Sequence, residues 1–249
     1  MLPAARPGFT LRADGVSDSE RSAVKLGIIG AGSLGTALGE RFATTGHEIM
    51  FGGGASAQDA AVRLHAEVGS NAETAAFGDV VILAVPFSAI DAALADAGPL
   101  RGRVLWSCVN ALRPDYTGLA IGFDNSAAEE VARRAPGARV IAALPPFANA
   151  IATGQLYYER DLEPTVFICG DDAAAKQIVE GLVREIGAQP VDAGPLTAAR
   201  LVEPAMMLAV SIAYAGVPRD VGLRLLERTS LTPQTPSRSG RHGNTRRTR

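Results

Sequence analysis

The expected fold is decided by one short segment, KLGIIGAGSLG at residues 25–35. An apolar run of strand character turns there, through three glycines, into a helical pattern. Gly30 permits the tight turn, Gly32 lets the backbone approach a diphosphate, and Gly35 lets the helix pack closely on the sheet. The segment therefore predicts a dinucleotide-binding turn rather than a plain strand–turn–helix corner, which needs no glycines at this spacing. Its members are Gly30, Ala31, Gly32, Ser33, Leu34 and Gly35.

The composition limits the class of protein. A chain of 249 residues with 47% hydrophobic content can bury a core of one large domain, with or without a small appendage. The formal net charge of -2 gives no overall attraction to nucleic acid or to an anionic membrane. No apolar run approaches the roughly 20 residues that span a bilayer, and the first residues do not read as a signal peptide. We therefore expect a cytoplasmic protein without nucleic-acid or membrane partners.

No metal site is predicted. Cys108 and Cys169 each lie in an apolar, strand-like run and are far apart in sequence, so both are interpreted as core residues. The adjacent acids Asp171 and Asp172 open a helical pattern, where a cap and a favourable interaction with the helix dipole explain them more simply than a metal does.

The two ends of the chain differ from its middle. Residues 1–23 mix Pro and Gly with scattered charges, which predicts a flexible leader. Residues 229–249 are rich in Ser, Thr, Pro and Arg without any acid. Such a segment cannot form a core, and we favour a disordered basic tail over an arm that binds nucleic acid or an acidic partner.

The middle alternates apolar runs with helical patterns. Strands are predicted at 24–30, 48–51, 80–85, 104–108, 140–143, 165–169 and 190–192, and helices at 33–45, 56–68, 88–97, 126–135 and 172–186. Because the strand runs are continuously apolar, they suit parallel strands covered on both faces. We expect a doubly wound, mostly parallel α/β sheet, a Rossmann-like domain, over residues 24–195.

A C-terminal helical segment is predicted over residues 196–228, broken near residues 216–218. Its Met206 and Met207 are more often core residues than pocket residues. Their position after the last strand keeps the pocket interpretation open. The apolar surface of this segment has little else to cover it, so a homodimer is predicted.

Ligands of an open α/β sheet bind beyond the carboxyl ends of its strands. After the second strand, an NAD-binding domain would offer an acid to the ribose 2'-hydroxyl, but this chain offers Gly53, Gly54 and Ser56. Without the acid, NADP is favoured over NAD. Since no Arg or Lys stands there either, the 2'-phosphate would rest on backbone N–H groups, the Ser56 hydroxyl and the start of the next helix.

Later strand ends supply further candidates. The third predicted strand runs into Ala84-Val85-Pro86, where the proline turns the chain along the site. Asn110, after the fourth, binds a carboxamide or ribose, or else satisfies its own loop backbone. Pro145, Pro146 and Phe147, after the fifth, form a stiff apolar loop suited to a flat ring.

Over residues 24–228 the sequence resembles the NADPH-dependent coenzyme F-420 reductase family (F-420-dependent NADP oxidoreductases). The resemblance rests on GIIGAGSLGTALGERFATTGHEI, GDVVILAVPFSAI, CVNAL and TVFICGDDAAAKQIVEGLVREIGAQPVDAGPLTAARLVEPAMMLAV, taken in that order. It implies an oxidoreductase that exchanges a hydride between NADPH and a deazaflavin. That chemistry depends on stacking two rings at about 3 to 3.5 Å and needs no obligatory acid or base.

By this resemblance, the glycine turn, the turn at 52–56, Ala84 to Pro86 and Asn110 would bind NADP(H). The loop at 145–148 with Met206, Met207, Val217 and Pro218 would contact coenzyme F-420. The chain departs from the family in having Gly53-Gly54 where Ser or Thr followed by Arg is common. It also has LPPFAN at 144–149 where an A-F-N-T element is common.

Two other functions remain open. One is a different NAD(P)-dependent reductase, acting on an imine or carbonyl, for which Tyr157, Tyr158 or Tyr214 would have to donate a proton. The other is a non-catalytic NADP-binding sensor. His47 and His65 are interpreted as surface residues that flank helices, so no histidine is assigned as a general acid.

Overall fold

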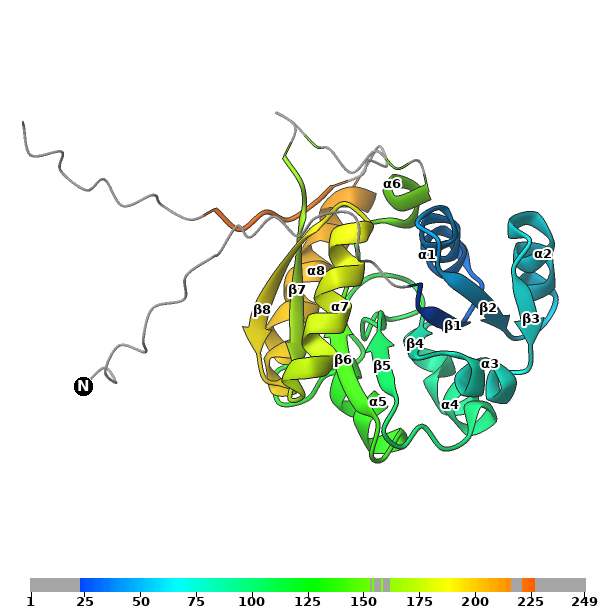
Figure 1. Ribbon diagram of the computed structural model, residues 1–249. Helices are drawn as coiled ribbons and strands as arrows, with labels where there is room; N and C mark the ends of the chain where they lie inside the picture. The colour runs from blue at the N-terminus through cyan, green and yellow to red at the C-terminus, as the bar shows by residue number, and fades with distance from the viewer. Residues whose placement is uncertain (1–22, 153, 155–157, 159–161, 216–220, 227–249) are drawn as a thin grey trace, which may run out of the picture.

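The computed structural model describes residues 23–152, 154, 158, 162–215 and 221–226. These residues form one eight-stranded sheet in the order β3-β2-β1-β4-β5-β6-β7-β8. The strands are β1 Lys25–Ile29, β2 Glu48–Gly52, β3 Glu67–Gly69, β4 Val80–Leu83, β5 Val104–Ser107, β6 Arg139–Ala143, β7 Thr165–Gly170 and β8 Gln189–Gly194. Figure 1 shows the sheet running from β3 at one edge to β8 at the other.

The strand order places a topological switch point at β1. The chain passes from β1 outward to β2 and β3, then returns to β4 on the other side of β1. The helices that follow β1 and β4 therefore leave in opposite directions and open a crevice beyond the carboxyl end of β1. All described strand pairs are parallel except β6 with β7. The predicted mostly parallel α/β sheet is confirmed.

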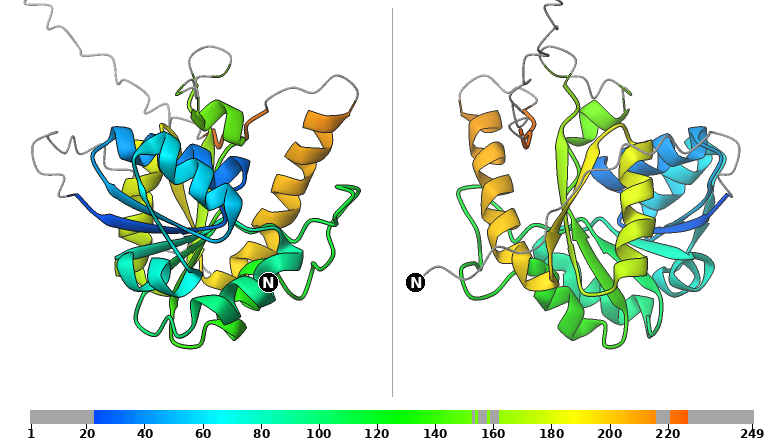
Figure 2. Two further views of the ribbon diagram at one scale, coloured as in Figure 1. Left: turned by 90° about the vertical axis from the view of Figure 1, so that its right-hand side faces the viewer. Right: turned by 60° about the vertical axis from the view of Figure 1, so that its left-hand side comes forward.

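Helices cover both faces of the sheet. They are α1 Ser33–Thr44, α2 Ala55–Leu64, α3 Asn71–Phe77, α4 Ile90–Ala97, α5 Ala127–Arg134, α6 Ala148–Ala152, α7 Ala173–Glu185 and α8 Ala199–Tyr214. Alternate strand residues face two separate cores: Ile82 and Trp106 lie on the face of α1, α2, α6 and α7, whereas Val81 and Leu105 lie on the face of α4 and α5. Figure 2 shows α7 and α8 on opposite sides of the sheet.

The predicted boundaries differ from the structure mainly near the β3 edge. The helix predicted at 56–68 ends at Leu64, because His65 adopts a left-handed backbone and the chain turns into β3. Neither β3 nor α3 was predicted. A strand of three residues carries no period to detect. The start of α3 is nevertheless marked by a capping box between Ser70 and Glu73.

The last helix leaves part of its apolar surface uncovered. Leu201 of α8 is 77% exposed, and Leu208, Ile212 and Tyr214 are exposed as well. Contrary to the expectation from the sequence, the described residues include one stretch, Leu196–Tyr214, that is long and apolar enough to cross a membrane by length and composition; 33% of the tested window is buried. Residues 221–226 were predicted as part of the helical segment, but they are not helical. They lie alongside the start of β7, where the Thr165 N–H donates to the Leu223 carbonyl at 2.7 Å.

The predicted leader at 1–23 and basic tail at 229–249 lie, except for Ala23, outside the described residues. Cys108 and Cys169 are buried and free, as predicted. Asp172 caps α7, its carboxylate accepting from the Ala175 N–H at 2.8 Å, which confirms the predicted cap.

Candidate functional site

The glycine turn follows β1 at the switch point. Gly30 has φ +102°, and a Cβ there would lie 2.5 Å from the Ala84 carbonyl oxygen. A Cβ on Gly35 would collide with the Gly30 carbonyl, so this glycine seats α1 against the turn. Gly32 is different, since nothing lies within 4 Å of where its Cβ would be. Its open side is therefore free for a ligand to approach the backbone.

The starts of α1 and α2 leave backbone donors without a side-chain partner. Gly32 and Gly54 occupy the N-cap positions of these helices, and neither helix has a side-chain cap or an acid in its first turn. By contrast, α3, α5 and α7 are capped by Ser70, Ser126 and Asp172. The uncapped N–H groups together with the helix dipole favour a bound anion such as a phosphate.

A first hollow, here called the glycine cavity, encloses about 210 Å³ beside these two helix starts. It is lined by Ile29, Gly30, Ala31, Gly52, Gly53, Gly54, Ala55, Ser56, Ala57, Asn71, Val85 and Ala93. The structure therefore brings together six of the residues predicted to hold the dinucleotide: Gly30, Ala31, Gly53, Gly54, Ser56 and Val85. None of the lining residues is acidic or basic.

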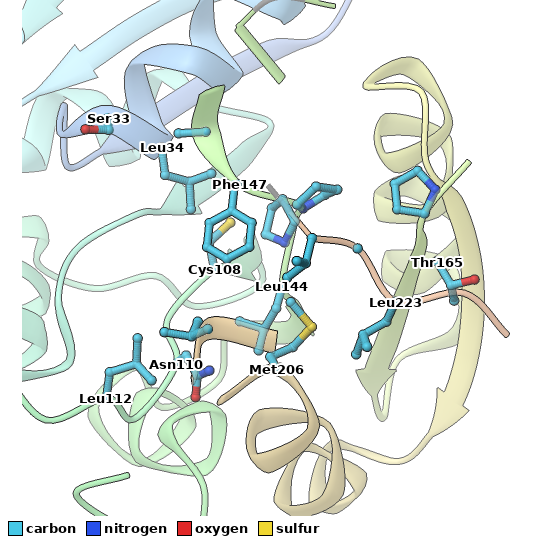
Figure 3. A pocket seen from close by; sticks show the side chains of 17 residues that line it. Ser33, Leu34, Cys108, Asn110, Leu112, Leu144, Phe147, Thr165, Met206 and Leu223 are labelled. Atoms are coloured by element: carbon cyan, nitrogen blue, oxygen red, sulfur yellow. The ribbon is translucent and has the colours of Figure 1, made fainter. Parts of the chain in front are cut away.

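A second hollow, here called the apolar cavity, encloses about 250 Å³ on the other side of the glycine turn. Its lining consists of Ser33, Leu34, Cys108, Asn110, Leu112, Leu144, Pro145, Pro146, Phe147, Ala148, Pro164, Thr165, Met206, Val210, Val221, Gly222 and Leu223. Figure 3 shows Phe147, Leu144 and Met206 among the side chains around it. The volume is below the roughly 300–1,000 Å³ of whole-ligand pockets, so it suits one part of a larger molecule.

Asn110 offers the apolar cavity a hydrogen-bond acceptor. Its Nδ2 donates to the Glu203 carbonyl at 3.3 Å, which orients the amide. Its Oδ1 is buried and has no partner among the described residues. A buried amide oxygen normally has a hydrogen-bond donor, so a ligand N–H or hydroxyl would satisfy it.

Glu203 fixes α8 beneath this site, a role that the sequence did not suggest. Only 3% of the residue is exposed. Its carboxylate accepts from the backbone N–H groups of Ala127, at 2.9 Å, and Ala128, at 3.1 Å, at the start of α5. Burial raises the pKa of Glu203 to about 7, although these N–H groups act in the opposite direction.

The spacing of Arg200 and Glu203, three residues apart in the sequence, predicts that they pair with each other, and this prediction is wrong. The structure shows instead that Arg200 donates to Glu129 on α5, at 2.6 and 2.9 Å. That contact lowers the pKa of the Glu129 carboxyl. Glu203, as described above, binds backbone amides.

An aromatic group stands at the end of α8. Tyr214 lies 6.0 Å from Tyr116 in a stacked arrangement and 6.4 Å from Phe147 in an edge contact, measured between ring centroids. Because Phe147 lines the apolar cavity, these rings extend its apolar surface outward.

Comparison with known proteins shows which family the first part of the sheet domain is similar to. Residues 25–111 match the sequence model of the family described as NADP oxidoreductase, coenzyme F-420-dependent. Over those residues the chain is therefore similar to the F-420-dependent NADP oxidoreductase family. The description of this family agrees with the predicted enzyme class, an NADP-dependent oxidoreductase, and with the predicted cofactors, NADP(H) and coenzyme F-420.

Individual relatives of this family extend the similarity beyond the matched domain. The chain is 29% identical over 225 residues to the F-420-dependent NADP reductase of Methanothermobacter thermautotrophicus, an alignment covering 81% of this chain and 94% of that protein. A solved structure from Arthrobacter sp. FB24, described as a candidate F-420-dependent NADP-reductase, has a TM-score of 0.72 at 25% identity and covers 82% of this chain and 100% of that chain. An imine reductase from Pseudomonas sp. shares the fold alone, with a TM-score of 0.58 at 14% identity over 75% of this chain and 61% of that one.

Some residues that the family resemblance assigned lie elsewhere. Met207 is buried but does not line the apolar cavity, in contrast to Met206 one position earlier on α8. Ala84 meets the glycine turn through its carbonyl, and Pro86 lines neither cavity. Val217 and Pro218, and Tyr157 of the alternative function, lie outside the described residues.

The interpretation of His47 as a surface residue is wrong. Its side chain is 5% exposed, and its Nε2 lies 2.6 Å from a Glu185 carboxylate oxygen on α7. Its Nδ1 accepts from the Val24 N–H at 3.1 Å. His47 therefore joins the residue before β1 to the end of α7, at the amino ends of the strands and away from the site. His65 is exposed, as predicted.

Proposed function

We propose that this protein transfers a hydride between NADPH and the deazaflavin coenzyme F-420 at the junction of its two cavities. The observation that carries the proposal is the position of the glycine turn. Gly30 and Ala31 border the glycine cavity, whereas Ser33 and Leu34 border the apolar cavity. A diphosphate at the start of α1 would have its adenosine end on one side of the turn and its nicotinamide end on the other.

The residues present fit both halves of such a ligand. The backbone N–H groups at the starts of α1 and α2, with the Ser56 hydroxyl, would hold phosphate oxygens. The absence of an acid from the lining of the glycine cavity supports NADP(H) over NAD(H). The unpartnered Oδ1 of Asn110 would accept from the carboxamide or a ribose hydroxyl on the nicotinamide side.

The chemistry then depends on orientation. When bound, a reduced nicotinamide supplies a hydride directly to a second ring stacked on it. The chain's own part is to hold the two rings flat against each other: Pro145, Pro146 and Phe147 form one wall of the apolar cavity and Met206 another. These side chains also exclude water, which protects the hydride from side reactions.

The lining of the apolar cavity offers no acid–base catalyst. Cys108 is its one conventional titratable side chain, and burial raises the pKa of this thiol well above its usual range. A direct hydride transfer needs no such group, whereas reduction of an imine or carbonyl requires a proton donor. Tyr214 stands outside the lining, and Tyr158 lies within hydrogen-bond distance of the Val221 carbonyl, at 3.5 Å. The cavity therefore favours the deazaflavin over the alternative substrate.

We further propose a division of the chain into a dinucleotide-binding domain, residues 24–195, and a C-terminal segment, residues 196–228, that contains α8. We propose that α8 pairs with a second copy of the chain. The exposed Leu201 and Leu208 support pairing, because an uncovered apolar stripe marks an interaction site. A cytoplasmic location is proposed from the composition, to be tested by cell fractionation. Sedimentation should show a species of twice 25.8 kDa, and Leu208→Glu should halve it. A wild-type monomer would contradict the pairing.

The function is tested by mixing the protein with NADPH and oxidised coenzyme F-420 and following the visible absorbance band of the deazaflavin. We expect the band to bleach, and NADP to form in equal amount. Binding of NADPH without bleaching would indicate a sensor. Turnover only with an imine or carbonyl compound would indicate the other reductase. Either result would reject the proposed activity.

A further inference from the structure

Asn71 stands at the edge of the glycine cavity, in an element that the sequence analysis missed. It is the first residue of α3, immediately after the short strand β3, and its side chain helps to line the cavity. Its Oδ1 is enclosed and has no hydrogen-bond partner among the described residues. Since buried amide oxygens are nearly always paired in folded proteins, this atom needs an explanation.

The Asn71 amide has room because the neighbouring residue 52 is a glycine and has no side chain. A Cβ on Gly52, the last residue of β2, would lie 2.8 Å from Asn71 Oδ1 and 2.9 Å from Thr74 Oγ1. Thr74 Oγ1 is also buried without a partner in the described part of the chain. A side chain at position 52 would therefore displace both groups. Because residue 52 is glycine, the polar amide of Asn71 can lie at the edge of the glycine cavity.

The surroundings point to a ligand that carries both hydroxyl and phosphate groups. Next to the amide are Gly53, the uncapped start of α2 and Ser56, and the cavity lining contains no charged side chain. Backbone N–H groups and a hydroxyl can bind phosphate oxygens, but they discriminate poorly between one sugar and another. An Asn amide offers a carbonyl acceptor and two N–H donors on one rigid group. It is the one lining amide side chain, and it can bind a ribose hydroxyl and a phosphate together.

We propose that Asn71 is a specificity-determining residue that recognises the 2' position of the adenosine ribose. Its Nδ2 donates to the 2'-phosphate of NADP(H), and its Oδ1 accepts from a neighbouring ribose hydroxyl. This inference rests on the proposed function, because it assumes that a dinucleotide occupies the glycine cavity. It explains how the chain prefers NADP(H) without the basic residue that is common after the second strand in the family.

The test is a titration of the full chain with NADPH and, separately, with NADH, followed by nicotinamide fluorescence in the absence of coenzyme F-420. Asn71→Asp keeps the shape of the side chain but replaces two donors with a negative charge. We expect its affinity for NADPH to fall about 10- to 100-fold, the usual effect of losing a hydrogen bond to a charged group. Its affinity for NADH should hold or rise, because a carboxylate accepts from the 2'-hydroxyl.

The matched control is Asn110→Asp, the same chemical change at the nicotinamide side. This variant should lower the affinities for NADPH and NADH by the same factor and leave the ratio of the two affinities unchanged. Asn71→Ala provides a second variant in case the aspartate disturbs the start of α3, and it too should lower the preference for NADPH. Thermal melting of each variant checks that it is folded.

The outcomes separate this inference from the proposed function. If the wild-type protein binds neither nucleotide, the proposed function fails and the inference fails with it. If the wild type binds NADPH but both Asn71 variants keep its ratio of NADPH to NADH affinity, the role of Asn71 alone is overturned. A loss of the preference in both variants, with the ratio kept in Asn110→Asp, supports it.

Discussion

The starts of α1 and α5 present the same kind of backbone N–H donors, but only those of α5 have side-chain partners within the described part of the chain. At α1, Gly32 leaves the N–H groups without a side-chain partner and leaves open space in front of them. At α5, Ser126 caps the helix and the Glu203 carboxylate from α8 binds the next two N–H groups. One helix start is left without a side-chain partner, while the other is filled by a carboxyl group of the chain itself.

The difference shows how to tell a binding helix start from a structural one. A helix dipole is common to both, so the dipole alone does not mark a site. What distinguishes α1 is that no part of the described chain supplies the negative charge that its N–H groups favour. At α5 the internal carboxylate also fastens the last helix to the sheet domain. The carboxyl group of Glu203 therefore serves packing, and the position of α8 sets the wall of the apolar cavity that Met206 provides.

The largest expected effect comes from filling the start of α1 with an internal acid, as α5 is filled. Gly32→Asp would place a carboxylate on the N–H groups that the diphosphate needs and would repel it. NADPH affinity should fall about 1,000-fold, or roughly 4 kcal/mol, from the loss of two or more charge-assisted hydrogen bonds. The melting temperature should hold or rise slightly, since Asp is a good N-cap residue. Fluorescence titration and thermal melting measure the two effects.

Gly181→Asp is the matched control for this change. It adds the same charge within α7, where nothing lies within 4 Å of the position of a Cβ. Its NADPH affinity should equal that of the wild type. Unchanged affinity in Gly32→Asp would show that α1 does not hold the diphosphate, and the comparison between the two helix starts would lose its functional meaning.

A smaller effect is expected from the acid that fills α5. Because burial raises the pKa of Glu203 to about 7 from 4.5, the folded chain binds this proton more tightly than the unfolded chain does. Between these two values, the contribution of this group to stability falls as pH rises, by at most about 3 kcal/mol. Glu203→Gln removes the titration, so the variant should lose this fall. Urea unfolding at about pH 5 and about pH 7.5 compares the free energies of unfolding.

Glu129→Gln serves as the control of opposite sign. Arg200 lowers the pKa of the Glu129 carboxyl in the folded state, so this group stabilises the protein above its ordinary pKa of 4.5 and loses that contribution as pH falls below it. The variant should therefore differ from the wild type in acid and leave the fall between pH 4.5 and 7 in place. An identical pH profile for Glu203→Gln and the wild type would contradict the buried, titrating carboxylate.

The smallest effect is expected at the start of α3, where Ser70 and Glu73 form a capping box. Ser70 accepts from the Glu73 N–H at 3.2 Å, and Glu73 returns a contact to the Ser70 N–H. Ser70→Ala should cost about 1 kcal/mol of stability. Because Asn71 follows directly, the nucleotide preference reports whether the cap also positions that amide. A preference equal to that of the wild type would show that α3 holds Asn71 in place without its cap.

Sequence patterns predicted most of the fold because local signals coincided with the tertiary arrangement. The continuous apolar runs of β1, β4 and β5 became inner parallel strands, as expected for strands buried on both faces. The edge strand β3 was missed because Glu67-Val68-Gly69 is short and half polar. His47 was misread because its burial depends on α7, which lies 138 residues away in sequence at Glu185.

In the candidate site too, some residues were predicted from local patterns and others were not. The glycine turn and the apolar loop 145–147 were predicted from local chemistry. Four residues of the turn, Gly30, Ala31, Ser33 and Leu34, and all three of the loop line the two cavities. Asn71 and Glu203 were not predicted as site residues, since an Asn before a helix and a Glu within one have ordinary explanations. Only their surroundings reveal them: an enclosed oxygen without a donor in one case, and two backbone N–H groups from another helix in the other.

The sequence by itself determined the parallel α/β class and the glycine turn after the first strand, because glycine spacing and apolar runs act over a few neighbouring residues. The tertiary structure decided which polar groups face the ligand and which serve packing. Burial and hydrogen-bond partners are set by segments far apart in the chain, such as β2 with α3 or α5 with α8. No local pattern specifies those contacts, and they alone determine whether a helix start is left open for an anion.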